Sequence, residues 1–432
     1  MDQVKFRWVR KEILVQLVFF LGIFRSIKLF GPRGVMCPSD WLTITGPCSW
    51  GNVFFELFLW AVAFLLLGLE LVWDRDWKGL LRTMRANWLV LGFAGLAGLS
   101  MIWSIQAQIT LYKFIVLLGS SVMAIYIGHV YDLARLLKSL TRFVVWTSSL
   151  SLLLMLFIPD FAIETIVYFE GSWNGIFLHR NYLGVFMAIG MIVFLVKLLS
   201  WEKKRKASLL FNLVMLVVAS VLVFGSQSAT AIISALVTVG FALFVFAWLR
   251  WGQGLKNWYY FGLLGGSLVA LMIVLTNLDY FLGFFGRNAT LTGRVPMWQH
   301  LFQRVIGQRL WLGHGYGTIW HFEGLVMELT RSLSWGVKVM IGDNGLIDIL
   351  LHLGLVGVML ILLLIVLGFT RAIRYFLQER TMIAAFPILL LVFGVVANIS
   401  LSLILEIESM VWMIAVASLV RISNNTQNKI LT

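Results

Sequence analysis

Hydrophobic residues are gathered along this chain in long, nearly uninterrupted runs separated by short polar segments. A helix that crosses a bilayer needs about 20 mostly apolar residues, and most of these runs have that length. The pattern predicts an all-α polytopic membrane protein with about twelve transmembrane helices. The predicted spans are 12–30, 53–73, 86–104, 110–131, 143–159, 181–200, 207–225, 228–249, 257–277, 344–368, 382–401 and 404–421.

Composition supports a membrane fold and excludes the soluble classes. Of the 432 residues, 60% are hydrophobic and 12% are charged, whereas soluble proteins average about 45–50% apolar and about 25% charged residues. The net charge is +14, but no basic segment outside the spans is long enough to form a nucleic-acid-binding module. We therefore expect the lipid bilayer, and no nucleic acid, among the partners of this chain.

The basic residues indicate how the chain is oriented, because Lys and Arg collect in cytoplasmic loops. With twelve spans and a cytoplasmic N-terminus, 22 of the 34 Lys and Arg residues fall in cytoplasmic segments. The sequence thus predicts cytoplasmic N- and C-termini. The even-numbered connections, counted from the N-terminus, are cytoplasmic and the others are periplasmic.

One long connection divides the chain into three predicted parts. Spans one to nine occupy 1–277, a periplasmic loop occupies 278–343, and the last three spans with the cytoplasmic tail occupy 344–432. Connections of such length are uncommon and often functional. Cys37 and Cys48 lie in the first outer loop, where they form either a disulfide or two separate thiols.

The long loop is rich in arginine, although outer loops are usually poor in basic residues. Arginine binds phosphate well through its planar guanidinium group, so a lipid-linked diphosphate is the candidate ligand. An amphipathic helix that binds phospholipid headgroups is the alternative. The candidate arginines of this loop are Arg287, Arg294 and Arg304.

Two further motifs place polar residues where the chain enters the membrane from the outside. The segment "GSWNGIFLHRNYLG" brings His179, Arg180 and Asn181 to the start of a span. The text "IGDNGLIDILLHLGLVG" places Asp343 at the mouth of another span and Asp348 one turn inside it. Ionisable residues within a span are costly and are often functional. A buried polar pair that fixes helix packing is the other interpretation of Asp348 and the nearby His352.

These motifs together resemble the O-antigen ligase / Wzy-type polymerase superfamily, most closely its exopolysaccharide-production polymerase branch. The matching motifs are "LSMIWS…TLYKF", "GIFLHRNYLG", "TLTGRVPMWQHL…GHGYG" and "DNGLIDILLHLGLVG", in that order. The resemblance covers nearly the whole chain. It implies a fold similar to the C-type glycosyltransferases, with a long helical periplasmic loop over the active site.

The resemblance also implies roles for individual residues. The arginines that hold the lipid diphosphate in the family correspond to Arg180 and Arg294. The family has a histidine that activates the acceptor hydroxyl, and the corresponding position in this chain is Asp343. An aspartate therefore replaces the family histidine. His314 or His321 is the alternative base. An unperturbed carboxyl group has a pKa of about 3.9, which makes it an available but weak base. Further candidate substrate-binding residues are His179, Asn181, Arg287, Trp298, Arg304, His314, Tyr316 and Asn344.

From this resemblance we expect the protein to be a polymerase. It would join undecaprenyl-diphosphate-linked repeat units at the periplasmic face of the bacterial inner membrane. Arginines that neutralise the diphosphate would make a metal or cofactor unnecessary. The partners are the lipid-linked glycan donor and a glycan acceptor, with a chain-length regulator as an open possibility. Three alternatives remain: a ligase that transfers glycan to lipid A–core, a transporter or flippase, and a homologue that has lost activity.

Overall fold

The computed structural model describes residues 2–27, 47–164, 170–200, 206–251, 294–332, 341–403 and 410–431. These residues form helices, and two isolated β-bridges are the only strand-like pairings among them. The predicted span 257–277, Arg287 and Cys37 lie outside the described residues. The pairing of Cys37 with Cys48 therefore stays a prediction. An all-helical protein is thus confirmed for the described part of the chain.

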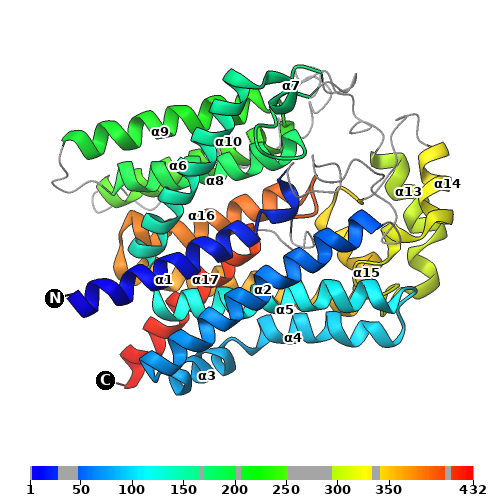
Figure 1. Ribbon diagram of the computed structural model, residues 1–432, viewed down its shortest axis with the longest axis horizontal. Coiled ribbons are helices and arrows are strands. Elements are labelled where there is room, and N and C mark those ends of the chain that lie inside the picture. The colour runs from blue at the N-terminus through cyan, green and yellow to red at the C-terminus, as the bar shows by residue number, and fades with distance from the viewer. Residues whose placement is uncertain are drawn as a thin grey trace.

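The helices run mostly along one direction and form a bundle (Figure 1). The N-terminal half contains α1 (Asp2–Leu21), η1 (Phe24–Ser26), α2 (Pro47–Asp74), α3 (Trp77–Ala86), α4 (Trp88–Leu99), η2 (Ser100–Ile102), α5 (Ala107–Val130), α6 (Leu133–Phe157) and α7 (Pro159–Ala162). The remaining helices are α8 (Arg180–Leu199), α9 (Lys206–Gly225), α10 (Ala229–Trp251), α13 (Arg294–Arg304), η3 (Ile306–Arg309), η4 (Ile319–His321), α14 (Glu323–Ser332), α15 (Gly345–Glu379), α16 (Met382–Ala397) and α17 (Met410–Leu431).

Seven of the described helices are long and apolar enough to cross a membrane: α2, α5, α6, α8, α9, α10 and α15. An eighth span is possible if α3 and α4 count together, although the two are bent by 76°. The apolar helices α16 and α17 are shorter in their hydrophobic parts, and charged residues fill the first half of α1. The protein is therefore a polytopic membrane protein, while the number twelve stays a prediction.

Some helix boundaries differ from the predicted spans for local reasons. Helix α6 begins ten residues before the predicted span 143–159, because the Asp132 side chain accepts a hydrogen bond from the Arg135 backbone and caps the helix there. The predicted span 86–104 is broken at Asn87, where α3 ends and α4 begins. Capping at Asp132 and the bend at Asn87 thus set these helix boundaries, which hydrophobicity alone does not predict.

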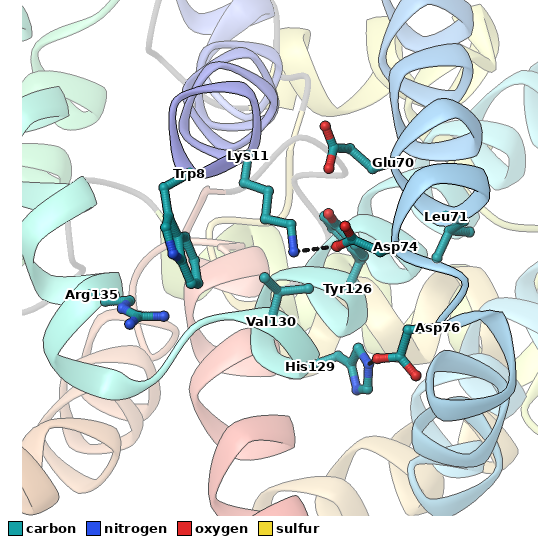
Figure 2. A pocket seen from close by; sticks show the side chains of 10 residues that line it. All are labelled: Trp8, Lys11, Glu70, Leu71, Asp74, Asp76, Tyr126, His129, Val130 and Arg135. Carbon is teal, nitrogen blue, oxygen red and sulfur yellow. Dashed lines mark hydrogen bonds and ion pairs between the residues drawn. The ribbon is translucent and has the colours of Figure 1, made fainter. Parts of the chain in front are cut away.

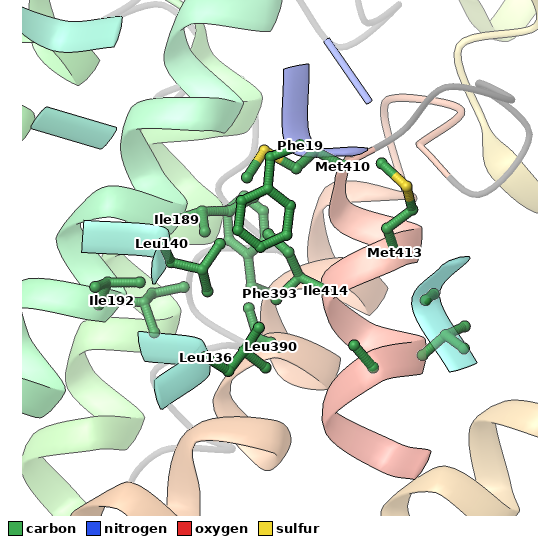
Figure 3. Packing of buried hydrophobic residues seen from close by; sticks show 14 of the residues in the cluster. Phe19, Leu136, Leu140, Ile189, Ile192, Leu390, Phe393, Met410, Met413 and Ile414 are labelled. Carbon is green, nitrogen blue, oxygen red and sulfur yellow. The ribbon is translucent and has the colours of Figure 1, made fainter. Parts of the chain in front are cut away.

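The core of the bundle forms where helices from both halves of the chain meet. Helix α8 is the most enclosed of the seven candidate spans, and it packs against α6, α9, α10 and α16. Figure 3 shows buried side chains of α1, α6, α8, α16 and α17 in one apolar cluster. Phe19, Ile189 and Phe393 belong to this cluster and are fully or almost fully buried. The apolar contacts therefore join the first helix to the last two.

The two ends of the bundle differ in their side chains. The start of α1 and the end of α17 lie at one end, and α13, α14 and the start of α15 lie at the other (Figure 1). At the end with the termini, a cavity of about 410 Å³ is lined by residues of α1, α2, α5 and α6, among them Lys11, Glu70, Asp74 and Arg135 (Figure 2). Lys11 pairs with Asp74 there, and His129 Nε2 lies 2.9 Å from Asp76. The Lys11–Asp74 ion pair joins α1 to α2, and the contact between His129 and Asp76 joins α5 to the start of α3.

Helix α15 is broken at Gly354, whose φ of +64° is outside the helical range. An unbroken helix would pair the Leu355 and Val356 N–H groups with the carbonyls four residues earlier. Instead they donate to Leu310 and Trp311, at 2.9 and 3.3 Å. The orphaned carbonyls of α15 accept in turn from His314 and Gly315, at 2.8 and 3.0 Å. Residues 310–315 therefore complete the hydrogen bonds of both halves.

Only glycine fits at this break. A Cβ atom on Gly354 would lie 2.2 Å from the carbonyl group of Trp311, and the positive φ would strain any other residue. The segment that contains Gly313, Gly315 and Gly317 also has positive φ at these glycines. The GHGYG motif at 313–317 and the break at Gly354 thus form the two sides of one backbone junction. This junction holds residues 310–317 against α15.

Candidate functional site

The loop and α15 meet in an ion pair between two residues predicted to be catalytic. Arg294 begins α13 and Asp343 precedes α15, and Arg294 Nε donates to Asp343 Oδ2 at 2.9 Å. The two side chains are 8% and 19% exposed. A guanidinium so well buried is only weakly screened by water, which strengthens its attraction for anions. The structure therefore brings the predicted arginine and the predicted base together.

The turn that carries Asp343 is held from several directions. Asp343 has a φ of +50°, which is unusual for a residue other than glycine. Trp298 of α13 donates its indole N–H to the Gly342 carbonyl at 2.7 Å. The Asn344 side chain caps α15 by accepting from the Leu346 and Ile347 backbones, and it donates to the Ile399 carbonyl at 3.0 Å. Trp298 and Asn344 were predicted to bind substrate, and their contacts here position the turn.

Asp348 anchors the other side of the same turn. Its side chain is buried, and it accepts hydrogen bonds from the Gly342 backbone and from the Trp320 indole at 2.7 Å. It also accepts from the Ser402 hydroxyl. One carboxylate thus joins the loop, the start of α15 and the segment after α16. Asp348 thereby holds Gly342, the residue next to Asp343, in place.

Replacing Asp348 by alanine should destabilise the protein strongly. Three buried donors would lose their acceptor, and each unsatisfied group costs about 1–3 kcal/mol. We expect a clear fall in the melting temperature, followed by tryptophan fluorescence in detergent. Ser402→Ala removes only one of the bonds and should cause a smaller fall. A melting temperature of Asp348→Ala equal to that of the unchanged protein would contradict this role.

The second predicted arginine lies at the start of α8. Arg180 is 7% exposed, and its Nη1 donates to the Gln227 carbonyl at 3.0 Å. His179 caps α8 by accepting from the Asn181 backbone. The Asn181 side chain accepts from the Ser228 hydroxyl at 2.8 Å. The "HRN" motif therefore packs against the turn between α9 and α10.

The two arginine-containing clusters are connected through the segment after α16. Thr230, at the start of α10, shares a hydrogen bond of 2.6 Å with Ser400. The neighbouring Ile399 carbonyl accepts from Asn344, and the Gly345 N–H donates to the Asn398 carbonyl. Residues 398–400 consequently bind both the turn after α9 and the turn before α15.

Other predicted site residues have different surroundings. His314 is buried, its Nε2–H donates to the Val305 carbonyl at 3.2 Å, and its backbone pairs with α15. Burial lowers the pKa of His314, so the ring is neutral at pH 7. Tyr316 is fully buried, and its ring lies 6.1 Å from that of His352. Arg304 is exposed at the end of α13. His314 and Tyr316 thus stabilise the junction at Gly354.

Residues missed by the sequence reasoning are mostly backbone partners. Gln227, Asn398 and Ile399 contribute carbonyl groups, and such contacts leave no signal in a single sequence. Ser402 was also missed, although a hydroxyl opposite a buried aspartate is a common partner. Within the described residues, no group of three or more His, Cys, Asp or Glu side chains is arranged to hold a metal ion. Metal-independent chemistry stays a prediction.

Comparison with known proteins relates the chain distantly to polysaccharide production. No family model matches it. Among curated proteins, the exopolysaccharide production protein ExoQ of Rhizobium meliloti (strain 1021) is 23% identical over 345 residues. The matched region covers 77% of this chain and 75% of ExoQ. This similarity supports the superfamily resemblance at a coarse level: a membrane protein with a relative in exopolysaccharide production.

Proposed function

We propose that this chain is a membrane glycosyltransferase that joins oligosaccharide units linked to polyprenyl diphosphate into a longer polysaccharide. The Arg294–Asp343 pair carries this proposal, because it places a buried cation beside a carboxylate at the mouth of a membrane helix. Arg180 supplies a second buried cation, braced by the same segment. The predicted orientation puts this end of the bundle in the periplasm of a bacterial inner membrane.

The donor already carries its activation, because the anomeric carbon is bonded to a diphosphate leaving group. An acceptor hydroxyl oxygen attacks this carbon from the opposite side while the bond to the diphosphate oxygen breaks. The bonding electrons leave with the diphosphate, and the anomeric configuration is inverted. Arg180 and Arg294 would stabilise the developing negative charge, and this kind of electrostatic stabilisation is often the largest contribution to catalysis.

Asp343 is the proposed base, and its pairing with Arg294 suggests how it becomes available. In the ion pair the guanidinium neutralises the carboxylate and makes it a poorer proton acceptor. A diphosphate carries more negative charge than a carboxylate and would compete for Arg294. Donor binding would then release Asp343 to accept the hydroxyl proton of the acceptor. The pair thereby couples occupation of the donor site to activation of the base.

A ligase that transfers the glycan to lipid A–core remains the second candidate. It uses the same donor chemistry and differs in its acceptor. The similarity to an exopolysaccharide production protein favours polymerisation. We place the ligase second for this reason.

The decisive experiment uses purified protein in proteoliposomes with synthetic polyprenyl-diphosphate-linked repeat units. We expect longer glycans by mass spectrometry, with one polyprenyl diphosphate released for each unit added, and an unchanged rate after addition of a chelator. Transfer to lipid A–core without elongation would establish the ligase instead. If neither longer glycans nor free polyprenyl diphosphate formed, the proposed function would be wrong.

A further inference from the structure

Leu310, Trp311 and Leu312 expose large apolar side chains although they belong to the loop expected in water. Their exposed fractions are 40%, 64% and 44%. Tryptophan and leucine at such exposure are unfavourable in contact with water when they are contiguous. We call residues 310–312 the apolar segment. The contacts of the apolar segment with α15 and with the end of α4 indicate whether it faces water or lipid.

The position of the apolar segment is fixed by its hydrogen bonds to α15. The Leu310 and Trp311 carbonyls accept from Leu355 and Val356, directly after the break. The apolar segment therefore lies at the level of these two residues of α15. The depth of Leu355 in the bilayer then gives the depth of the segment.

The length of α15 below the break sets that depth. An apolar run extends from Leu355 to Phe369, and Thr370 and Arg371 follow it. These fifteen residues span about 22 Å at a rise of about 1.5 Å per residue. A hydrocarbon core is about 30 Å thick. Leu355 lies sixteen residues before Arg371, or about 24 Å along the helix. If Arg371 marks the inner boundary, Leu355 lies about 6 Å below the outer boundary, and any tilt of α15 lowers it further.

Irregular backbone at this depth requires that its polar groups be paired. Gly313 N–H donates to the Arg309 carbonyl at 2.9 Å, and the Leu312 carbonyl accepts from the Trp103 indole at 3.0 Å. Arg309 in turn donates to the Trp103 carbonyl at 2.7 Å. Together with the bonds to α15, these contacts pair all three carbonyl groups of the apolar segment within the protein.

The exposed side chains continue the apolar surface of the membrane helices on both sides. Leu99 at the end of α4 and Ile102 in η2 are 59% and 80% exposed. Met359 and Leu362 on α15 are 55% and 43% exposed. Helix α4 packs against α15, and the Trp103 contacts join the end of α4 to the apolar segment. One surface thus runs from α4 across residues 310–312 to α15.

We propose that residues 310–312 form a re-entrant segment whose side chains contact the acyl chains of the outer leaflet. The occupant of this surface is the lipid bilayer itself, because the surface is continuous with helices that cross it. The loop after α13 is accordingly anchored in the membrane rather than suspended in water. This inference rests on the membrane fold and does not depend on the proposed reaction.

Nitroxide accessibility tests the depth directly. The full chain would carry a spin label on p-acetylphenylalanine at position 311, which leaves Cys37 and Cys48 unchanged, in vesicles of phosphatidylethanolamine and phosphatidylglycerol. Leu362, on the exposed face of α15, is the lipid control. Gln303, exposed on α13, is the aqueous control. Collision rates with oxygen, which concentrates in the bilayer, and with a water-soluble nickel chelate are then compared.

We expect the label at position 311 to gain oxygen accessibility and to lose nickel accessibility relative to position 303, toward the values at position 362, which lies about 9 Å deeper on α15. Nickel accessibility at position 311 equal to that at position 303 would overturn the proposal. If the variant at position 311 does not fold, position 312 replaces it under the same criterion. Because no glycan is used, failure here leaves the proposed function to be judged separately.

Discussion

Arg294→Ala protein is expected to lose glycan elongation while keeping its fold. The substitution removes the buried guanidinium that would hold the departing diphosphate, and loss of one such electrostatic contact lowers kcat by about 10²–10³-fold. Arg294 contacts Asp343 and its side chain is 8% exposed, so its charge acts in a poorly screened environment. The measurement is chain length and released polyprenyl diphosphate in proteoliposomes.

Two further variants separate charge from geometry and from the general effect of losing an arginine. Arg294→Lys retains the charge but not the planar fork that contacts two oxygens, so it should recover only part of the rate. Arg331→Ala removes an exposed arginine of α14 from the same loop region and should leave elongation unchanged. Elongation by Arg294→Ala at the rate of Arg331→Ala would remove Arg294 from the mechanism.

The spans without charged interruptions could be predicted from the sequence to within a few residues. The predicted spans 181–200 and 207–225 correspond to α8 (Arg180–Leu199) and α9 (Lys206–Gly225). Such runs need no partner to specify a membrane helix, because the backbone must satisfy its own hydrogen bonds in lipid. The break in α15 could not be predicted in this way. A glycine within an apolar run is compatible with a continuous helix, and the partners of this break lie some forty residues earlier in the chain.

The candidate site was predicted as a set of residues but not as an arrangement. Arg294 and Asp343 were both selected, for charge and for resemblance, and their direct pairing is a property of the fold. The sequence left Asp348 and His352 as either functional residues or a buried polar pair. Both are buried, and Asp348 contacts Gly342, Trp320 and Ser402, while His352 packs against Tyr316. Contacts between distant segments decide such roles, and a hydropathy pattern contains no information on them.

Asp343→Ala protein should bind the donor but fail to transfer it. Loss of a general base lowers kcat by about 10²–10⁴-fold. The same substitution frees Arg294 from its ion pair, so the KM for the donor should stay equal or fall. This combination distinguishes a base from a residue that merely holds Arg294 in place, because loss of positioning would raise KM. Steady-state kinetics with a defined lipid-linked donor measures both constants.

Asp343→His provides a sharper test through its pH dependence. Histidine has an unperturbed pKa of about 6.5 and accepts a proton only when neutral. The rate of this variant should therefore rise as the pH increases through that value, whereas a carboxylate base is already ionised there. Asp76→Asn is the matched control, because it removes a carboxylate that pairs with His129 at the opposite end of the bundle. Full activity of Asp343→Ala would show that the carboxylate is no base, and that the proton of the acceptor leaves by another route.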